Sequence, residues 1–290
     1  MDWKKLALVA ALSGAAGAMV GCGGPGDEPE LNETQIYVIS NISIPEVMGS
    51  GAAATAAGFN LDGMVSTGAG TTCVELTPDY MSSNDPGEEG VDNGLANLVP
   101  TIEMLLGDGE TLDQTLQRQI TEGDLLLMMR IEDIDSYNND SSVSVQLLFG
   151  TVPGGGAPMV SGSSLAPGQT FEAMELGAPV TGSIVSGRLR VNTDLLTLSI
   201  NTGEFMLPLN IRNAQIRANI TADALVNGAI GGSLRVMEIA DAAEMIMPGL
   251  RATVLSVLGG VADMEPQAGD PTMCDALSTG ILFGAVDADI

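Results

Sequence analysis

The chain has 290 residues, with 37 acidic and 10 basic side chains and no histidine, so its formal net charge is −27 at pH 7. This charge repels phosphate backbones, because nucleic-acid binding depends on Lys and Arg, and we expect no nucleic-acid partner. The absence of histidine excludes Ser-His-Asp and Cys-His catalysis and imidazole-bound zinc. The length fits one large domain.

Residues 1–21 have the pattern of a secretory leader. Lys4 and Lys5 precede an apolar stretch, residues 6–20, which is shorter than the roughly 20 residues that a membrane-spanning helix needs. The leader ends in Met-Val-Gly followed by Cys22, which resembles the lipobox of bacterial lipoproteins. That resemblance implies that Cys22 is lipidated and becomes the N-terminus, so that the chain is attached to a membrane by its lipid.

Cleavage before Cys22 removes Asp2, Trp3 and both lysines, which leaves 8 arginines and 36 acidic residues. Without lysine, Schiff-base chemistry and a phosphate-binding P-loop are excluded as well. Residues 22–35 are rich in Gly, Pro and acidic residues, which predicts a flexible tether. By similarity to other Gram-negative lipoproteins, glycine after the cysteine implies sorting to the outer membrane. We expect residues 36–290 to form a single β-rich domain.

Apolar side chains at every second position predict most of the strands. In chain order these are residues 35–44, 125–131, 143–149, several segments within 182–234, and 281–286. The alternation over 205–211 resumes in the opposite phase over 214–220, which predicts a tight turn or bulge at Arg212 and Asn213. Residues 125–131 are apolar on both faces, as expected of a central strand.

Helical spacing predicts a helix over residues 95–106, kinked or restarted at Pro100, and a second helix opened by a Thr111–Gln114 capping box and ended by Gly123. Ser233 is the expected cap of a third helix, and Pro248 separates it from a fourth. The expected fold is therefore mainly β with a few helices (α+β): an antiparallel β-sandwich or barrel-like sheet with short helices packed at its ends.

Two cysteines remain once Cys22 carries a lipid. Cys73 lies in a loop-rich segment and Cys274 lies near the C-terminus. An exported pair of cysteines predicts a disulfide, because the compartments outside the cytoplasm are oxidising.

Three acidic loops offer oxygen ligands for a cation. The richest of them combines hard oxygen donors with Gly87 and Gly90, and these donors are Asn84, Asp85, Glu88, Asp92 and Asn93. This composition is compatible with a Ca²⁺ loop, although the spacing is not that of an EF-hand. The alternative is a set of solvated turns in which Asp and Asn form Asx-turns or cap helices.

Two classes of function remain open. The first is an envelope-anchored, non-catalytic binding or structural module whose partner is an envelope protein, a glycan or a small molecule. The second is a histidine-free hydrolase that uses paired carboxylates, as glycosidases do. Three Tyr and five Phe provide few aromatic platforms for a sugar, which disfavours the second.

Several short motifs resemble a family of uncharacterised exported lipoproteins from myxobacterial-type Gram-negative bacteria. They are the lipobox, the GFNLDG segment with the later Cys73, the GVDN turn that precedes a helix, and the terminal CDALSTGILFGAV. The resemblance implies an exported location and a single domain, and it implies no activity.

Overall fold

The computed structural model describes residues 32–106, 109, 111–201, 206–246 and 248–290. The residues from 31 onward belong to one compact unit. The predicted leader, Cys22 and nearly all of the predicted tether lie outside the described residues. Within the described residues, no helix is both long enough and apolar enough to cross a membrane.

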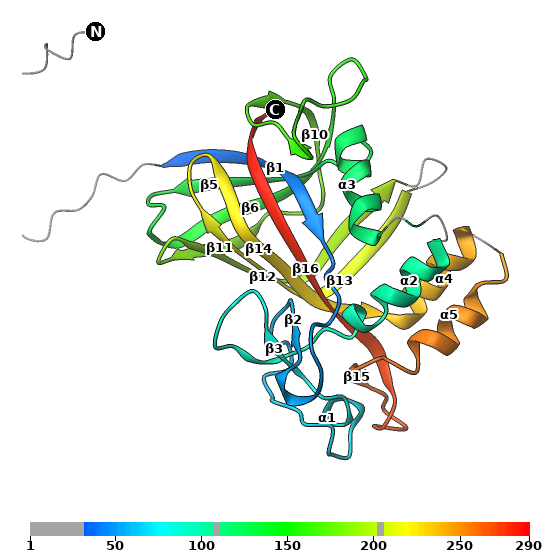
Figure 1. Cartoon of the computed structure of the whole chain (residues 1–290). Coiled ribbons are helices and arrows are strands. Elements are labelled where there is room, and N and C mark those ends of the chain that lie inside the picture. The colour runs from blue at the N-terminus through cyan, green and yellow to red at the C-terminus, as the bar shows by residue number, and fades with distance from the viewer. Residues whose placement is uncertain (1–31, 107–108, 110, 202–205, 247) are drawn as a thin grey trace, which may run out of the picture. The chain divides into compact units, whose positions relative to one another are not determined.

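The architecture is a ring of eight antiparallel strands, so of the two predicted alternatives the barrel-like sheet is confirmed (Figure 1). Around the ring the order is β1, β5, β6, β11, β12, β13, β14, β16, and β16 pairs with β1 to close it. The strands are β1 (Glu33–Ser43), β5 (Leu127–Ile134), β6 (Asn139–Thr151), β11 (Val180–Val185), β12 (Arg188–Asn201), β13 (Met206–Ile220), β14 (Ala224–Arg235) and β16 (Cys274–Asp289).

The register shows why these sequences close into a ring. Val191 lies opposite Ile216, Ile216 opposite Ile230, and Ile230 opposite Ile281, so apolar side chains of four neighbouring strands share the interior face. Each of the four is buried. Burial of such side chains contributes about 1.5–3 kcal/mol each, which favours the one register that turns them all inward.

The predicted irregularity at Arg212 and Asn213 is confirmed. Asn213 has a left-handed φ of 48°, and the pairing of β13 with β14 shifts by one residue between Arg212 and Gln215. Ile211 and Ala214 are consequently both buried, although they are three positions apart. The bulge keeps the apolar positions inward on both sides of the interruption.

The helix α3 (Leu112–Glu122) packs against the outside of the ring. The predicted capping box is present, with Gln114 N–H donating to the Thr111 hydroxyl and Thr111 N–H donating to the Gln114 amide oxygen. Gly123 ends the helix with a left-handed φ of 91°. The side chain of Asp113, in the first turn, accepts hydrogen bonds from the end of β1, which fixes the helix to that strand.

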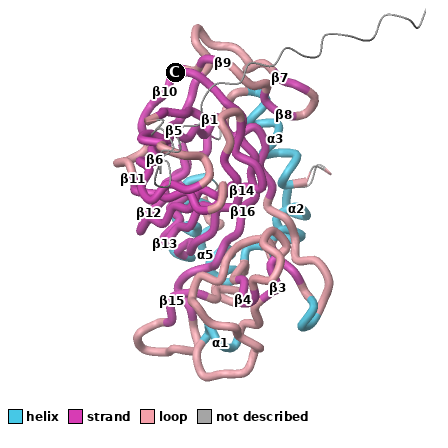
Figure 2. Tube along the Cα trace, turned by 90° about the vertical axis from the view of Figure 1, so that its left-hand side faces the viewer, coloured by secondary structure: helices cyan, strands magenta, loops and turns pink. Residues whose placement is uncertain are grey.

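A second, smaller core lies at one end of the ring (Figure 2). Cys73 and Cys274 form a disulfide inside it, with 5.7 Å between their Cα atoms, and Leu98, Leu258 and Leu277 pack around it. The elements of this region are η1 (Gly51–Ala53), β2 (Thr55–Ala56), α1 (Cys73–Leu76), β3 (Tyr80–Ser82), β4 (Glu89–Val91), η2 (Leu95–Asn97), α2 (Val99–Leu106), α4 (Val236–Ile246), α5 (Arg251–Leu258) and β15 (Met264–Pro266). Four short strands flank the ring: β7 (Val160–Ser161), β8 (Ser164–Leu165), β9 (Gln169–Thr170) and β10 (Glu172–Glu175).

One predicted cap is wrong. Ser233 lies inside β14, where it is buried and its hydroxyl donates to the Glu265 carboxylate, and α4 begins only at Val236. Strand pairing with β16 extends through Arg235, so the ladder outweighs the local capping preference. The helix predicted over residues 95–106 is divided near Pro100 into the 3₁₀ turn η2 and α2, as the proline suggested.

We expect the disulfide to contribute substantially to stability. It closes a loop with a sequence separation of 201 residues, which the chain-entropy model equates with an upper value of about 5 kcal/mol. Urea unfolding of Cys73→Ala/Cys274→Ala should show a loss of a few kcal/mol, and reductant should produce a similar loss in the unmodified chain but none in the variant. Equal unfolding midpoints for the variant and the unmodified chain would contradict a stabilising role.

Candidate functional site

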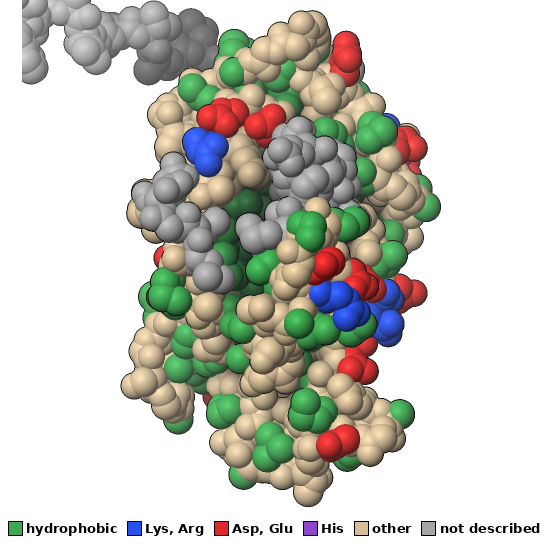
Figure 3. Space-filling model, turned by 90° about the vertical axis from the view of Figure 1, so that its right-hand side faces the viewer, with side chains coloured by type: hydrophobic (Ala, Val, Ile, Leu, Met, Phe, Trp, Pro, Cys, Tyr) green, Lys and Arg blue, Asp and Glu red, His purple; other side chains and the backbone are tan. Residues whose placement is uncertain are grey.

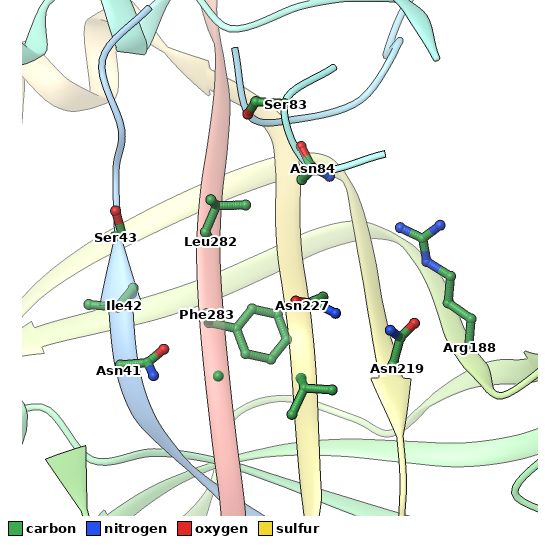
Figure 4. Close-up of a pocket in the computed structure, with 13 residues that line it drawn as sticks. Asn41, Ile42, Ser43, Ser83, Asn84, Arg188, Asn219, Asn227, Leu282 and Phe283 are labelled. Carbon is green, nitrogen blue, oxygen red and sulfur yellow. The ribbon is translucent and has the colours of Figure 1, made fainter. Parts of the chain in front are cut away.

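A groove of about 620 Å³ runs across the outer wall of the barrel. One side is formed by β1, β16, β14, β13 and β12, and the other side by Ser83 and Asn84 from the loop after β3 (Figure 4). We call it the amide groove, because four asparagines line it: Asn41, Asn84, Asn219 and Asn227. Its volume lies in the range of small-molecule sites, roughly 300–1,000 Å³.

The strand register directs the polar side chains into this groove. Asn41 lies opposite Gly284 on the outer face, whereas Ile42 and Phe283 lie opposite each other and are buried. A Cβ atom at position 284 would come within 2.9 Å of the Asn41 amide oxygen. Glycine at this position therefore lets the Asn41 amide lie flat against the neighbouring strand.

Three of these amides are available for a ligand. Asn41, Asn219 and Asn227 are exposed, and within the described part of the chain their side chains make no hydrogen bond. Asn227 has a left-handed φ of 52° at a bulge, where β14 has one extra residue relative to both of its neighbours. Exposed amides from three different strands thus face one groove (Figure 4).

The opposite side of the groove is held by a local hydrogen-bond network. Asn84 Oδ1 accepts the N–H of Gly58 at 2.9 Å and the Ser82 hydroxyl at 3.4 Å. Asn84 Nδ2 is buried and has no partner among the described residues. An unpaired buried donor reduces the stability of a protein by about 1–3 kcal/mol. A small movement of the Asn84 side chain that lets a ligand accept from Nδ2 would therefore be favourable.

Two arginines on the barrel wall fix the loop that carries Asn84. Arg188 contacts Asp85 at 2.7 Å, and Arg217 contacts Glu88 at 3.0 Å and Asp85 at 3.7 Å. The Arg217 guanidinium also lies 4.4 Å from the centre of the buried Phe59 ring, a cation–π contact. We call this network the arginine clamp. Other arginines pair with acidic side chains as well, among them Arg212 with Glu238 and Arg251 with Asp241, and Figure 3 shows arginines beside acidic side chains on another face.

The residues of the predicted calcium loop have separate roles in the structure. Asp85 and Glu88 belong to the arginine clamp, and Asn84 holds Gly58. Asp92 and Asn93 are buried. The Asn93 side chain donates to the carbonyls of Ala57 and Gly280 and accepts the N–H of Ala96. Within the described residues, no three Asp, Glu or Cys side chains are grouped as a metal ion would require. Calcium binding therefore stays a prediction from sequence composition.

Buried carboxyl groups lie beneath these loops, and their pKa values are raised. Burial raises the pKa of Asp92 to about 8, although the Leu61 N–H that its carboxylate accepts acts in the opposite direction. Burial likewise raises the pKa of Asp79 to about 6, and the hydrogen bonds from Ser66 and Asp92 oppose this shift. Burial also raises the pKa of Asp263 to about 6, against its hydrogen bonds with Ser278. The nearby carboxylates of Asp62, Asp79 and Asp263 raise the pKa of Asp92 further, because neighbouring negative charges disfavour its ionised form.

The amide groove has the chemistry of a binding site. None of its lining residues is acidic, and its one cation, Arg188, is already paired. The acids with raised pKa values, Asp79, Asp92 and Asp263, do not line it. Sequence reasoning did not identify the groove, because its residues come from distant strands and a loop.

Comparisons of the chain with protein-family models, with curated proteins and with solved structures found no match.

We predict that Asp92 makes the protein more stable at mildly acidic pH. Its pKa is 3.8 when exposed and about 8 in the folded chain, so the folded state binds more protons between these values. The stabilisation by Asp92 is fully present below pH 3.8, its pKa when exposed, and is lost as the pH rises through about 8, its pKa in the folded chain. The melting temperature should fall between about pH 5 and pH 8, and Asp92→Asn, which mimics the protonated acid, should reduce that fall by several degrees.

The matched control is Asp289→Asn, at an exposed carboxylate near the C-terminus. It should leave the pH dependence as it is in the unmodified chain, because an exposed acid has a similar environment in both states. Equal pH profiles for Asp92→Asn and Asp289→Asn would show that general charge repulsion, and not burial of Asp92, controls the stability.

Proposed function

We propose that this protein is a non-catalytic binding module of the bacterial envelope, anchored at the outer membrane by a lipid on Cys22, and that the amide groove holds a neutral, polyhydroxylated ligand such as a glycan. The observation that carries the proposal is the set of three exposed asparagine amides, from three strands, that face one groove without partners in the described protein.

The chemistry of the groove favours hydroxyl groups. A carboxamide presents two donors beside one acceptor, and a hydroxyl group both donates and accepts, so the two match without any charge. Val226, which is 45% exposed, and Leu282 add an apolar surface for the C–H face of a sugar ring. A polar rim above an apolar floor is the usual composition of a small-ligand site.

The charge distribution favours a neutral ligand over an anion. The chain has a formal net charge of −27, and the nearby guanidinium groups of Arg188 and Arg217 are paired with Asp85 and Glu88. An anionic ligand would have to compete with these carboxylates in the field of the whole protein. The hydrolase alternative receives no support from the groove, because no carboxylates face one another there.

The binding test uses residues 22–290 on an array of neutral and carboxylated oligosaccharides, followed by calorimetric titration of the strongest binder. We expect neutral glycans to bind and Asn41→Ala/Asn219→Ala to weaken them by about tenfold or more, because each lost hydrogen bond costs roughly 0.5–1.5 kcal/mol. Asn192→Ala is the matched control, since this exposed asparagine lies outside the groove. A preference for carboxylated glycans, or equal affinities for the two variants, would refute the proposal.

The anchor is tested separately from the groove. The full chain, expressed in a Gram-negative host, should enter the detergent-rich phase on Triton partitioning, and Cys22→Ala should move it to the aqueous phase. Loss of the acyl chains removes about 0.8 kcal/mol of membrane affinity per buried CH₂ group. If Cys22→Ala still follows the unmodified chain into detergent, the lipid assignment is incorrect.

A further inference from the structure

A second opening lies in the barrel wall between β6 and β12. The segment between β10 and β11 leaves the ladder of β6 at Gly177–Pro179, and β12 pairs with β11 only as far as Val191. Beyond that residue, β12 pairs with β13 alone. The two sides of the gap enclose a cleft of about 610 Å³, which we call the wall cleft.

The cause of the opening is the bend at Asn213. Residues Asp194 and Asn213 face each other across the β12–β13 ribbon, at the point where Asn213 has its left-handed φ of 48°. The alternation of buried and exposed residues is interrupted here in both strands. In β12, Val191 and Leu196 are both buried although they are five positions apart. Beyond Val191, β12 therefore has no partner among the described residues on the side of β10 and β11, although β10 itself pairs with β6.

The wall cleft is lined mostly by hydrocarbon. Its floor consists of Val145, Leu196 and Ile216, which belong to the barrel interior, and Leu147, Leu176 and Leu195 lie along its sides. Leu195 is 49% exposed. Removing such a side chain from water stabilises a complex by about 25 cal/mol for each Å² of apolar surface that is buried.

The charged groups at the rim are acidic. Glu175 and Asp194 line the wall cleft from opposite sides. Glu175 is paired with Arg130 at 3.1 Å, whereas Asp194 is exposed and forms no ion pair with any arginine among the described residues. An aliphatic cleft with one unpaired carboxylate at its rim matches an amphiphile that has a hydrocarbon chain and a cationic head group.

We propose that the wall cleft binds the hydrocarbon chain of a cationic amphiphile, with its head group beside Asp194. An extended peptide added to the open edge of β12 is disfavoured, because a charged residue and a local bend at an edge strand oppose strand addition. A fatty acid is disfavoured because its carboxylate would lie next to Asp194. This site is independent of the amide groove, with which it shares no lining residue.

The test uses N-phenyl-1-naphthylamine, a neutral apolar dye, with residues 22–290 in about 0.15 M NaCl, where screening limits attraction to the overall negative charge. Dodecyltrimethylammonium and dodecyl sulfate then compete with the bound dye below their micellar concentrations. We expect the cation to displace the dye at about a tenfold lower concentration than the anion. Ala178→Trp, at an exposed position of the cleft, should weaken dye binding at least about fivefold by filling the space.

Two charge variants separate the site from the overall charge of the protein. Asp194→Asn should reduce the preference for the cation by about threefold without changing the affinity for the dye, and Asp289→Asn should leave both unchanged. Equal competition by the two amphiphiles, or unchanged dye binding in Ala178→Trp, would overturn the proposal. Asn41→Ala/Asn219→Ala should bind the dye normally, so failure of the wall cleft and failure of the amide groove can be told apart.

Discussion

Closure of the ring by β1 and β16 is the constraint on which the rest of the structure depends. Val38 lies opposite Val286 and Ile42 opposite Phe283, so the first long strand of the described chain pairs with the last. Because a closed ring has no free edge along this seam, the backbone groups of both strands are satisfied there. The amide groove lies directly on the seam, since Asn41 and Gly284 face each other across it. The amide groove therefore exists only when the ring is closed.

Two arginines from the barrel wall offset the negative charge of the acidic loop that follows β3. The carboxylates of Asp85 and Glu88 are met by Arg188 and Arg217, which are 103 and 129 residues away along the chain. Arginine is suited to this role because its guanidinium stays charged and can pack on an aromatic ring, as Arg217 does on Phe59. Burial raises the pKa of Asp92 to about 8, which favours the uncharged form of this carboxyl group. Pairing with arginine thus reduces the repulsion among these loop carboxylates, and calcium binding stays a prediction.

Local patterns predicted the elements well, because their causes are local. Alternating apolar residues located the strands, the Thr111–Gln114 box opened a helix, and the change of phase at Asn213 located a bulge. The sequence left the choice between sandwich and barrel open, because that choice depends on pairing between residues 33–43 and 274–289. The site was missed for the same reason, since Asn41, Asn219 and Asn227 come together only through long-range register. Ser233 was misread because its local capping signal lies inside a strand held by β16.

Two asparagines have left-handed backbone conformations where the pairing of the barrel strands is irregular. Asn213 and Asn227 have left-handed φ values of 48° and 52°, a conformation that asparagine tolerates better than most residues other than glycine. Each lies at a bulge: the first bends the β12–β13 ribbon away from the wall, and the second places an extra residue of β14 beside the seam. A regular barrel of eight strands is filled by its own side chains and has little room for a ligand. Asn227 lines the amide groove, and Asn213 lies opposite Asp194 of the wall cleft in the β12–β13 register, so both candidate sites lie where the alternation of the sequence is interrupted.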